Sequence, residues 1–172
     1  MMKKIYDDEY LKFCLFGLVY ITMPVLMLIE MRLIDSEMYF HFGFFLPCTV
    51  IFSIWINDTM AYLVGSLIGK TPFSEISPKK TWEGTIGGAI LCVVIIGLEG
   101  YLVLNNFIQS AIIAAICAIF GTAGDLLESK LKRLANVKDS GSIMPGHGGF
   151  LDRFDSLLLA TIFVWLYIKL FL

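Results

Sequence analysis

The sequence predicts an all-α fold: a polytopic integral membrane bundle of about five transmembrane helices, formed by a single domain over residues 1–172. Hydrophobic residues make up 58% of the chain and charged residues only 16%, and the mean hydropathy is +0.79. Soluble domains usually carry about 45–50% apolar and about 25% charged residues. The composition therefore places the chain in the membrane class.

Five apolar runs are long enough, or nearly long enough, to cross a bilayer. They cover residues 11–31, 42–65, 89–104, 107–126 and 156–172. A helix needs about 20 residues to cross the hydrocarbon core, so the third and fifth runs are short for a full crossing. The first run has no clear small-residue cleavage site after it, so we expect it to stay as a membrane anchor.

The positions of the basic residues predict the orientation. With the N-terminus inside, eleven of the 13 Lys and Arg residues fall on one face, and Arg32 and Lys169 fall on the other. Lys and Arg prefer cytoplasmic loops. The two long polar loops, residues 65–88 and 129–155, are therefore expected on the cytoplasmic face of a bacterial inner membrane or an equivalent membrane.

Two classes of function are disfavoured. There is no basic patch interleaved with exposed aromatic residues, so we expect no nucleic-acid partner. The cysteines lie in apolar runs without C-x-x-C spacing, which argues against a zinc site or a disulfide framework. We interpret them as small hydrophobic residues: Cys14, Cys48, Cys92 and Cys117.

The first polar loop has the composition of a phosphate-binding segment. Pro72 and Pro78 argue against a continuous helix. The stretch SPKKTWEG brings together Ser77, Lys79 and Lys80, which supply a hydroxyl group and two ammonium groups to a phosphate. The alternative is a generic contact of the lysine pair with anionic lipid.

Asp58 interrupts the second apolar run near its middle. An acid at that depth costs about 2.5–3.5 kcal/mol on insertion scales, so it usually faces a polar cavity or a partner. We expect Asp58 to line a functional cavity, and a structural polar contact is the alternative. Glu99, in the third run, is interpreted as an interfacial residue near a helix end, and a buried acid with a functional role is the alternative.

Carboxylates gather at two predicted helix ends. If the fourth helix continues past the membrane, Asp125, Glu128 and Lys132 share one face. Asp152 and Asp155 stand three apart at the start of the last helix. We expect these acids to meet around one or two divalent ions, and oxygen ligands favour magnesium over zinc. Ordinary i, i+4 ion pairs are the alternative.

The loop between these helices adds groups that suit an anion. Arg133 and Lys138 can hold phosphate oxygens, Asp139 is a further possible metal ligand, and neighbouring glycines let backbone N–H groups approach closely. His147 lies between two of those glycines, where it can donate to a phosphate or only occupy a turn. Together with the apolar flanks, the loop indicates phosphoryl chemistry at a membrane surface.

Four segments resemble one family, in the same order. They are NDTMAYLVG, SPKKTWEG, GDLLESKLKR and SKLKRLANVKDSGSIMPGHGGFLDRFD. They resemble the phosphatidate cytidylyltransferases, or CDP-diacylglycerol synthases, over residues 57–172. The resemblance implies a magnesium-dependent membrane enzyme that converts CTP and phosphatidic acid to CDP-diacylglycerol and pyrophosphate. Family members usually carry more helices before the first of these segments.

This chemistry gives each predicted residue a role. Magnesium is assigned to Asp125, Asp152 and Asp155, with Glu128 and Asp139 as second choices. The substrate-binding residues are Asp58, Ser77, Lys79, Lys80, Arg133 and His147, and Lys138 joins the three Asp residues in the catalytic set. The alternatives are a CTP-dependent lipid kinase of the polyprenol or phytol type and a small cation-coupled transporter. A homodimer is compatible with so few helices around a polar cavity.

Overall fold

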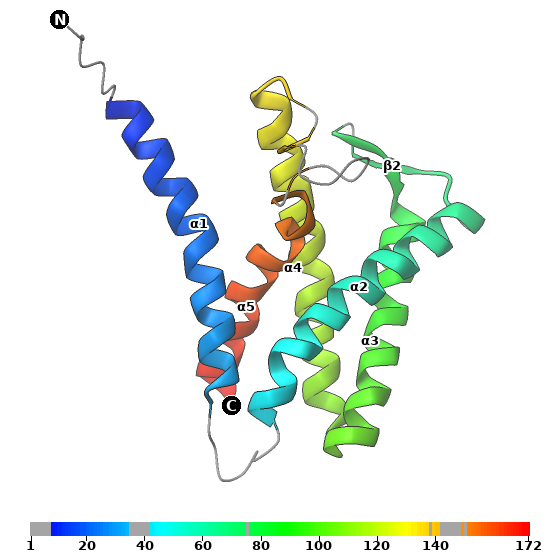
Figure 1. Cartoon of the computed structure of the whole chain (residues 1–172). Coiled ribbons are helices and arrows are strands. Elements are labelled where there is room, and N and C mark those ends of the chain that lie inside the picture. Colours follow the sequence, from blue (N-terminus) through cyan, green and yellow to red (C-terminus); the bar gives the residue numbers. More distant parts are fainter. Residues whose placement is uncertain (1–7, 35–41, 75, 138, 142–148, 150) are drawn as a thin grey trace, which may run out of the picture.

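The computed structural model confirms an all-α membrane bundle with a small β-hairpin at one end (Figure 1). It describes residues 8–34, 42–74, 76–137, 139–141, 149 and 151–172. The helices are α1 (Asp8–Arg32), α2 (Phe42–Ile68), α3 (Trp82–Leu104), α4 (Phe107–Leu134) and α5 (Asp155–Phe171), with the 3-10 turn η2 (Leu151–Arg153). The strands are β1 (Pro72–Ser74) and β2 (Ser77–Thr81).

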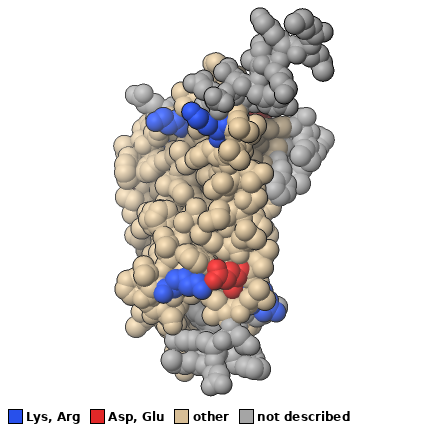
Figure 2. Space-filling view, turned by 90° about the vertical axis from the view of Figure 1, so that its left-hand side faces the viewer, with Lys and Arg blue, Asp and Glu red and all other residues tan. Residues whose placement is uncertain are grey.

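Within the described residues, four helices are long and apolar enough to cross a membrane: α1, α2, α3 and α4. α5 has 17 residues and is shorter than the other helices. Many large apolar side chains lie on the outer faces, for example Leu67 at 82% and Leu102 at 79% exposure. Figure 2 shows a broad uncharged belt between two levels of charged residues. Exposed apolar surface of this extent fits contact with lipid.

Small residues let α2 and α3 pack closely. A methyl group added at Gly88 would lie 2.5 Å from the backbone nitrogen of Ala61, and one at Gly84 would lie 2.6 Å from the Ala61 carbonyl oxygen. Lipid tails remove most of the hydrophobic drive for association, so helices in membranes depend on such close contact. Gly84 and Gly88 therefore fix the position of α3 against α2.

The α4 helix continues beyond the apolar run to Leu134. This continuation is the condition under which Asp125 and Glu128 were predicted to share one helix face. The α4 helix packs along α5, and both helices contribute to the main core with α2 and the end of α1. A methyl group at Gly124 would lie 2.6 Å from the Asp155 carbonyl oxygen. Gly124 thus allows the α4 backbone to contact the first turn of α5.

The first polar loop folds into a hairpin that the sequence analysis did not predict. β1 and β2 pair antiparallel, with Pro72 opposite Thr81 and Ser74 opposite Ser77. The two prolines correctly argued against a helix in this loop. The strands were not predicted because three and five residues are too few to show a clear alternation of polar and apolar residues. At the end of β2, Thr81 caps α3 by accepting a hydrogen bond from the Gly84 N–H at 3.2 Å.

The helix packing predicts that Gly88→Ala destabilises the bundle by about 1–3 kcal/mol, because the added methyl group meets the Ala61 backbone. Unfolding midpoints in detergent measure the effect. Gly17→Ala in α1 is the matched control, since nothing lies within 4 Å of an added methyl group there and both changes raise helix propensity. Equal midpoints for the two variants would contradict the packing argument.

Candidate active site

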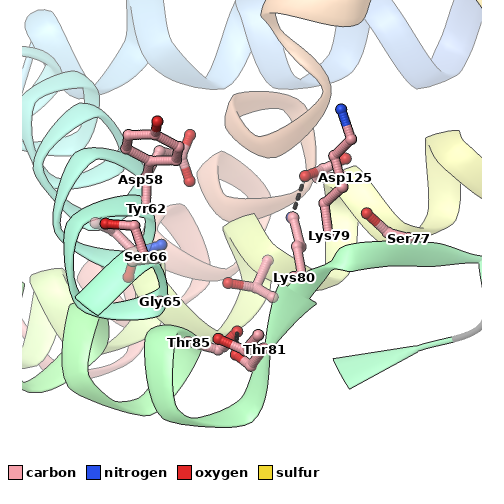
Figure 3. A pocket seen from close by; sticks show the side chains of 13 residues that line it. Asp58, Tyr62, Gly65, Ser66, Ser77, Lys79, Lys80, Thr81, Thr85 and Asp125 are labelled. Carbon is pink, nitrogen blue, oxygen red and sulfur yellow. Dashed lines mark hydrogen bonds and ion pairs between the residues drawn. The ribbon is translucent and has the colours of Figure 1, made fainter. Parts of the chain in front are cut away.

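A cavity of about 430 Å³, lined in part by charged and hydroxyl side chains, lies where β2 passes over α2, α3 and α4 (Figure 3). We call it the hairpin cavity. Its wall includes both lysines of SPKKTWEG and two acids from separate helices. The residues used below are Asp58, Ser77, Lys79, Lys80, Thr85 and Asp125.

Lys80 joins the hairpin to α4. Its Nζ donates to Asp125 Oδ2, as the dashed line in Figure 3 marks. Asp125 Oδ1 also accepts from Ser129 Oγ at 3.3 Å, one turn along α4. Both members of the ion pair are between a quarter and a third exposed. An ammonium group that is partly open to the cavity can exchange its carboxylate partner for a phosphate oxygen.

Glu83, in the first turn of α3, holds the chain that enters the hairpin. Its carboxylate accepts from the Thr71 hydroxyl at 2.8 Å and from the N–H groups of Lys70 and Thr71 at 3.2 Å. The Trp82 N–H donates to the Thr71 carbonyl at 3.0 Å, and the Trp82 ring lies 4.5 Å from that of Phe73. These contacts fix the hairpin over the cavity. The sequence analysis missed this role of Glu83.

A second group of acids lies where α4 meets the start of α5. We call Asp125, Glu128 and Asp155 the carboxylate cluster. Asp155 lies within electrostatic range of both Asp125 and Glu128, and the close contact at Gly124 accounts for this proximity. Asp58 from α2 lies within range of Asp125 and Asp155. Four acids from three helices therefore share one region.

Glu128 is the most deeply buried of these acids, with 2% of its side chain exposed. Lys132 Nζ lies 3.3 Å from Glu128 Oε2. Oε1 is buried and has no hydrogen-bond partner among the described residues. A buried carboxylate oxygen without a partner is costly, so this atom marks a place where a cation or a donor is missing.

Asp152, in η2, closes the polar loop. Its Oδ1 accepts from Lys132 Nζ at 2.6 Å, and its Oδ2 accepts from the Ser140 N–H and hydroxyl at 2.9 Å and from the Gly149 N–H at 2.6 Å. Partial desolvation opposes ionisation of this carboxyl group. The hydrogen bonds outweigh it and hold the pKa of Asp152 well below its usual range.

A second cavity, of about 660 Å³, lies between α2, η2 and the start of α5. We call it the α5 cavity. Apolar side chains such as Ile54, Trp55 and Leu157 line it beside Asp152 and Asp155. Asp58 lines both cavities. It therefore stands between the chamber below the hairpin, which Lys79 and Lys80 line, and the chamber beside α5.

The other predicted residues are placed as follows. Ser77 and Lys79 line the hairpin cavity with Lys80. Arg133 and Asp139 are exposed at the end of α4 and in the following loop. Lys138 and His147 lie outside the described residues. Thr85 and Thr122 also line the hairpin cavity. The polar character of Thr122 within an apolar run was the signal that could have found it, whereas Thr85 lies in the first polar loop.

The donor chemistry of the region fits a magnesium ion, which takes carboxylate oxygens. The unpartnered Glu128 Oε1 and the neighbouring acids support that fit. Within the described part of the chain, however, no three His, Cys, Asp or Glu side chains converge closely enough to hold an ion as they stand. Lys80 and Lys132 instead pair with the acids. An ion would have to displace at least one of these ammonium groups.

The contacts of Asp152 predict how its contribution to stability depends on pH. A carboxyl group with a lowered pKa stabilises the fold above its unfolded pKa, about 3.9, and loses that contribution as pH falls toward its folded pKa. In metal-free buffer, the unfolding midpoint of Asp152→Asn should lie below that of the wild type at pH 7 by a gap that persists to about pH 4 and narrows below it. Asp139→Asn, an exposed acid in the same loop, is the control. A gap that closes near pH 6 would contradict the assignment.

Comparison with known proteins identifies the family of this chain. A model of the Cytidylyltransferase family matches residues 3–171. The phosphatidate cytidylyltransferase of Bacillus subtilis (strain 168) is 39% identical over 99% of this chain and 63% of its own length. The chloroplastic phosphatidate cytidylyltransferase 4 of Arabidopsis thaliana is 48% identical over 66% of this chain and 29% of its own length. The phosphatidate cytidylyltransferase of Staphylococcus saprophyticus is 41% identical over 85% of this chain and 54% of its own length. The chain thus spans less than two thirds of these relatives, and it belongs to the cytidylyltransferase family.

Proposed function

We propose that this chain transfers CMP from CTP to phosphatidic acid and forms CDP-diacylglycerol and pyrophosphate. The names of its relatives support the reaction. The observation that carries the proposal is the juxtaposition of Lys79 and Lys80 with Asp125 in one cavity at the ends of membrane helices. A cavity of that kind suits a nucleotide from water and a headgroup from the bilayer.

The chemistry is a phosphoryl substitution. A phosphate oxygen of phosphatidic acid attacks the α-phosphorus of CTP, a new P–O bond forms, and the bond to pyrophosphate breaks. A phosphomonoester is largely ionised near pH 7, with a second pKa of about 6, so no general base is required. The main obstacle is the repulsion between two polyanions, which preorganised cations lower.

The residues divide this work between them. Lys79 and Lys80 hold phosphate oxygens of the nucleotide, with Ser77 as a hydrogen-bond donor. Asp125, Glu128 and Asp155 would hold magnesium, which would supply positive charge against the phosphates. Asp152 and Asp139 stay predicted ligands, and Arg133, Lys138 and His147 stay predicted phosphate contacts. The excess of Lys and Arg beside the site supports a cytoplasmic orientation.

Asp58 connects the two substrates in this proposal. It lines the hairpin cavity, which carries the lysines, and the α5 cavity, whose wall includes the apolar side chains of Ile54 and Trp55. We assign it to the boundary where the lipid phosphate meets the nucleotide. An acid there keeps the boundary polar within a membrane helix and could contribute to holding a cation.

A product assay tests the reaction. Purified chain is incubated with CTP labelled at the α-phosphorus, phosphatidic acid and magnesium, and the lipids are extracted. We expect label in CDP-diacylglycerol and release of pyrophosphate. Formation of CDP and a lipid phosphate from a lipid alcohol would identify a kinase instead. Cation uptake into vesicles without nucleotide turnover would identify a transporter.

Asp125→Asn tests the role of the carboxylates. The change keeps the shape of the side chain and removes its charge, so we expect turnover to fall by about 10²-fold or more while membrane insertion is unchanged. Glu99→Gln is the matched control, because it neutralises an acid near the C-terminal end of α3, away from the end that joins the hairpin. Wild-type turnover in the Asp125→Asn variant would remove Asp125 from the site.

A further inference from the structure

The N-terminal helix is held to α5 by contacts at the end of the bundle opposite the hairpin. Glu30 of α1 accepts from Trp165 Nε1 at 2.8 Å and pairs with Lys169 at 2.5 Å. The Lys169 ammonium group also lies 5.6 Å from the centre of the Trp165 ring. The two contacts of Glu30 join α1 to α5 and fix the register of the helices along the bundle axis as well as their distance.

This register places Tyr20 level with the start of α5. α1 and α5 run in the same direction (Figure 1). Tyr20 lies ten residues before Glu30, and Asp155 lies ten residues before Trp165. At 1.5 Å per helical residue, both positions are about 15 Å from the Glu30–Trp165 contact. Tyr20 lies within electrostatic range of Asp155 and Glu128, which agrees with this geometry.

Two buried polar atoms in this region lack partners and complement each other. The Tyr20 hydroxyl oxygen is buried and has no hydrogen-bond partner among the described residues, and the same holds for Glu128 Oε1. A phenol donates one hydrogen bond, and a carboxyl oxygen that carries no proton accepts one. Buried polar groups in folded proteins nearly always have a partner or an ordered water. The structure therefore brings an unused donor and an unused acceptor into one buried region.

We propose that Tyr20 is a positioning residue of the carboxylate cluster, and that its hydroxyl donates to Glu128 directly or through one water molecule. This inference rests on the proposed role of that cluster in holding a divalent ion. The hydrogen bond orients the Glu128 carboxylate toward Asp125 and Asp155. Residues that orient metal ligands in this way commonly change metal affinity by about 10–100-fold when they are removed.

The test measures Mn²⁺ binding to the full chain in lipid nanodiscs by electron paramagnetic resonance, without nucleotide or lipid substrate. Tyr20→Phe removes only the hydroxyl group, and we expect Mn²⁺ affinity to fall by about tenfold. Tyr101→Phe removes a hydroxyl group from an exposed tyrosine of α3 and should leave the affinity unchanged. Equal Mn²⁺ affinities for wild type and Tyr20→Phe would overturn the proposal.

A double-mutant cycle with Glu128→Gln separates positioning from a general structural effect. If Tyr20 acts through Glu128, the Tyr20→Phe change should have little further effect on Mn²⁺ affinity once Glu128 is replaced, because the two residues form one unit. Two losses that multiply would show that Tyr20 acts elsewhere and would overturn the proposal. Unchanged unfolding midpoints of the single variants would support a local effect.

The metal readout keeps this inference distinct from the proposed reaction. Coupling between Tyr20 and Glu128 in Mn²⁺ binding, without any CDP-lipid formed by the wild type, would support the Tyr20 assignment and contradict the proposed function. Normal turnover of the wild type, with no effect of Tyr20→Phe on Mn²⁺ affinity, would support the proposed function and contradict the Tyr20 assignment. A wild-type chain that binds no Mn²⁺ would overturn the Tyr20 assignment outright.

Discussion

The structure depends on bringing like charges together where a membrane helix ends. Asp125, Glu128 and Asp155 lie within electrostatic range of one another, and Glu128 is almost completely buried. Mutual repulsion and desolvation both oppose this arrangement. Lys80 and Lys132 offset part of that cost through ion pairs. A site that already requires cations is suited to exchange them for a metal ion or to share them with phosphates.

Glycines and a rigid hairpin make this arrangement accessible to the chain. Gly124 lets α4 contact the first turn of α5, so acids from two helices meet. Gly84 and Gly88 fix α3 against α2, and Glu83 at the start of α3 ties down the hairpin that carries Lys80. Packing that looks purely structural thus determines the distance between the lysines and the acids.

The sequence predicted the helices well because each rests on a long apolar run. It predicted Asp125 and Lys80 as site residues because charges are rare in such a chain and stand out. It did not predict the ion pair between them, since residues 45 positions apart in sequence meet only through tertiary packing. The sequence did not predict the role of Glu83 or the position of Tyr20 for the same reason. Both depend on which helix lies beside which.

The four donors to Asp152 illustrate a further limit of sequence reasoning. An acid three residues before another at a helix start matches a metal pair, and it matches equally a carboxylate that closes a loop. Only the neighbouring N–H groups distinguish the two. They come from Gly149, three residues before Asp152, and from Ser140, twelve residues before it, and only the fold shows that both point at the carboxylate.

The most direct test of the account is the anomalous diffraction of a crystal of this chain soaked with Mn²⁺. The account predicts a peak within coordination distance of Asp125 and Asp155, with Lys80 moved away from Asp125. Saturating Mn²⁺ that leaves the Lys80–Asp125 ion pair intact, with peaks only at exposed surface acids, would contradict the claim that these helix ends form a cation site.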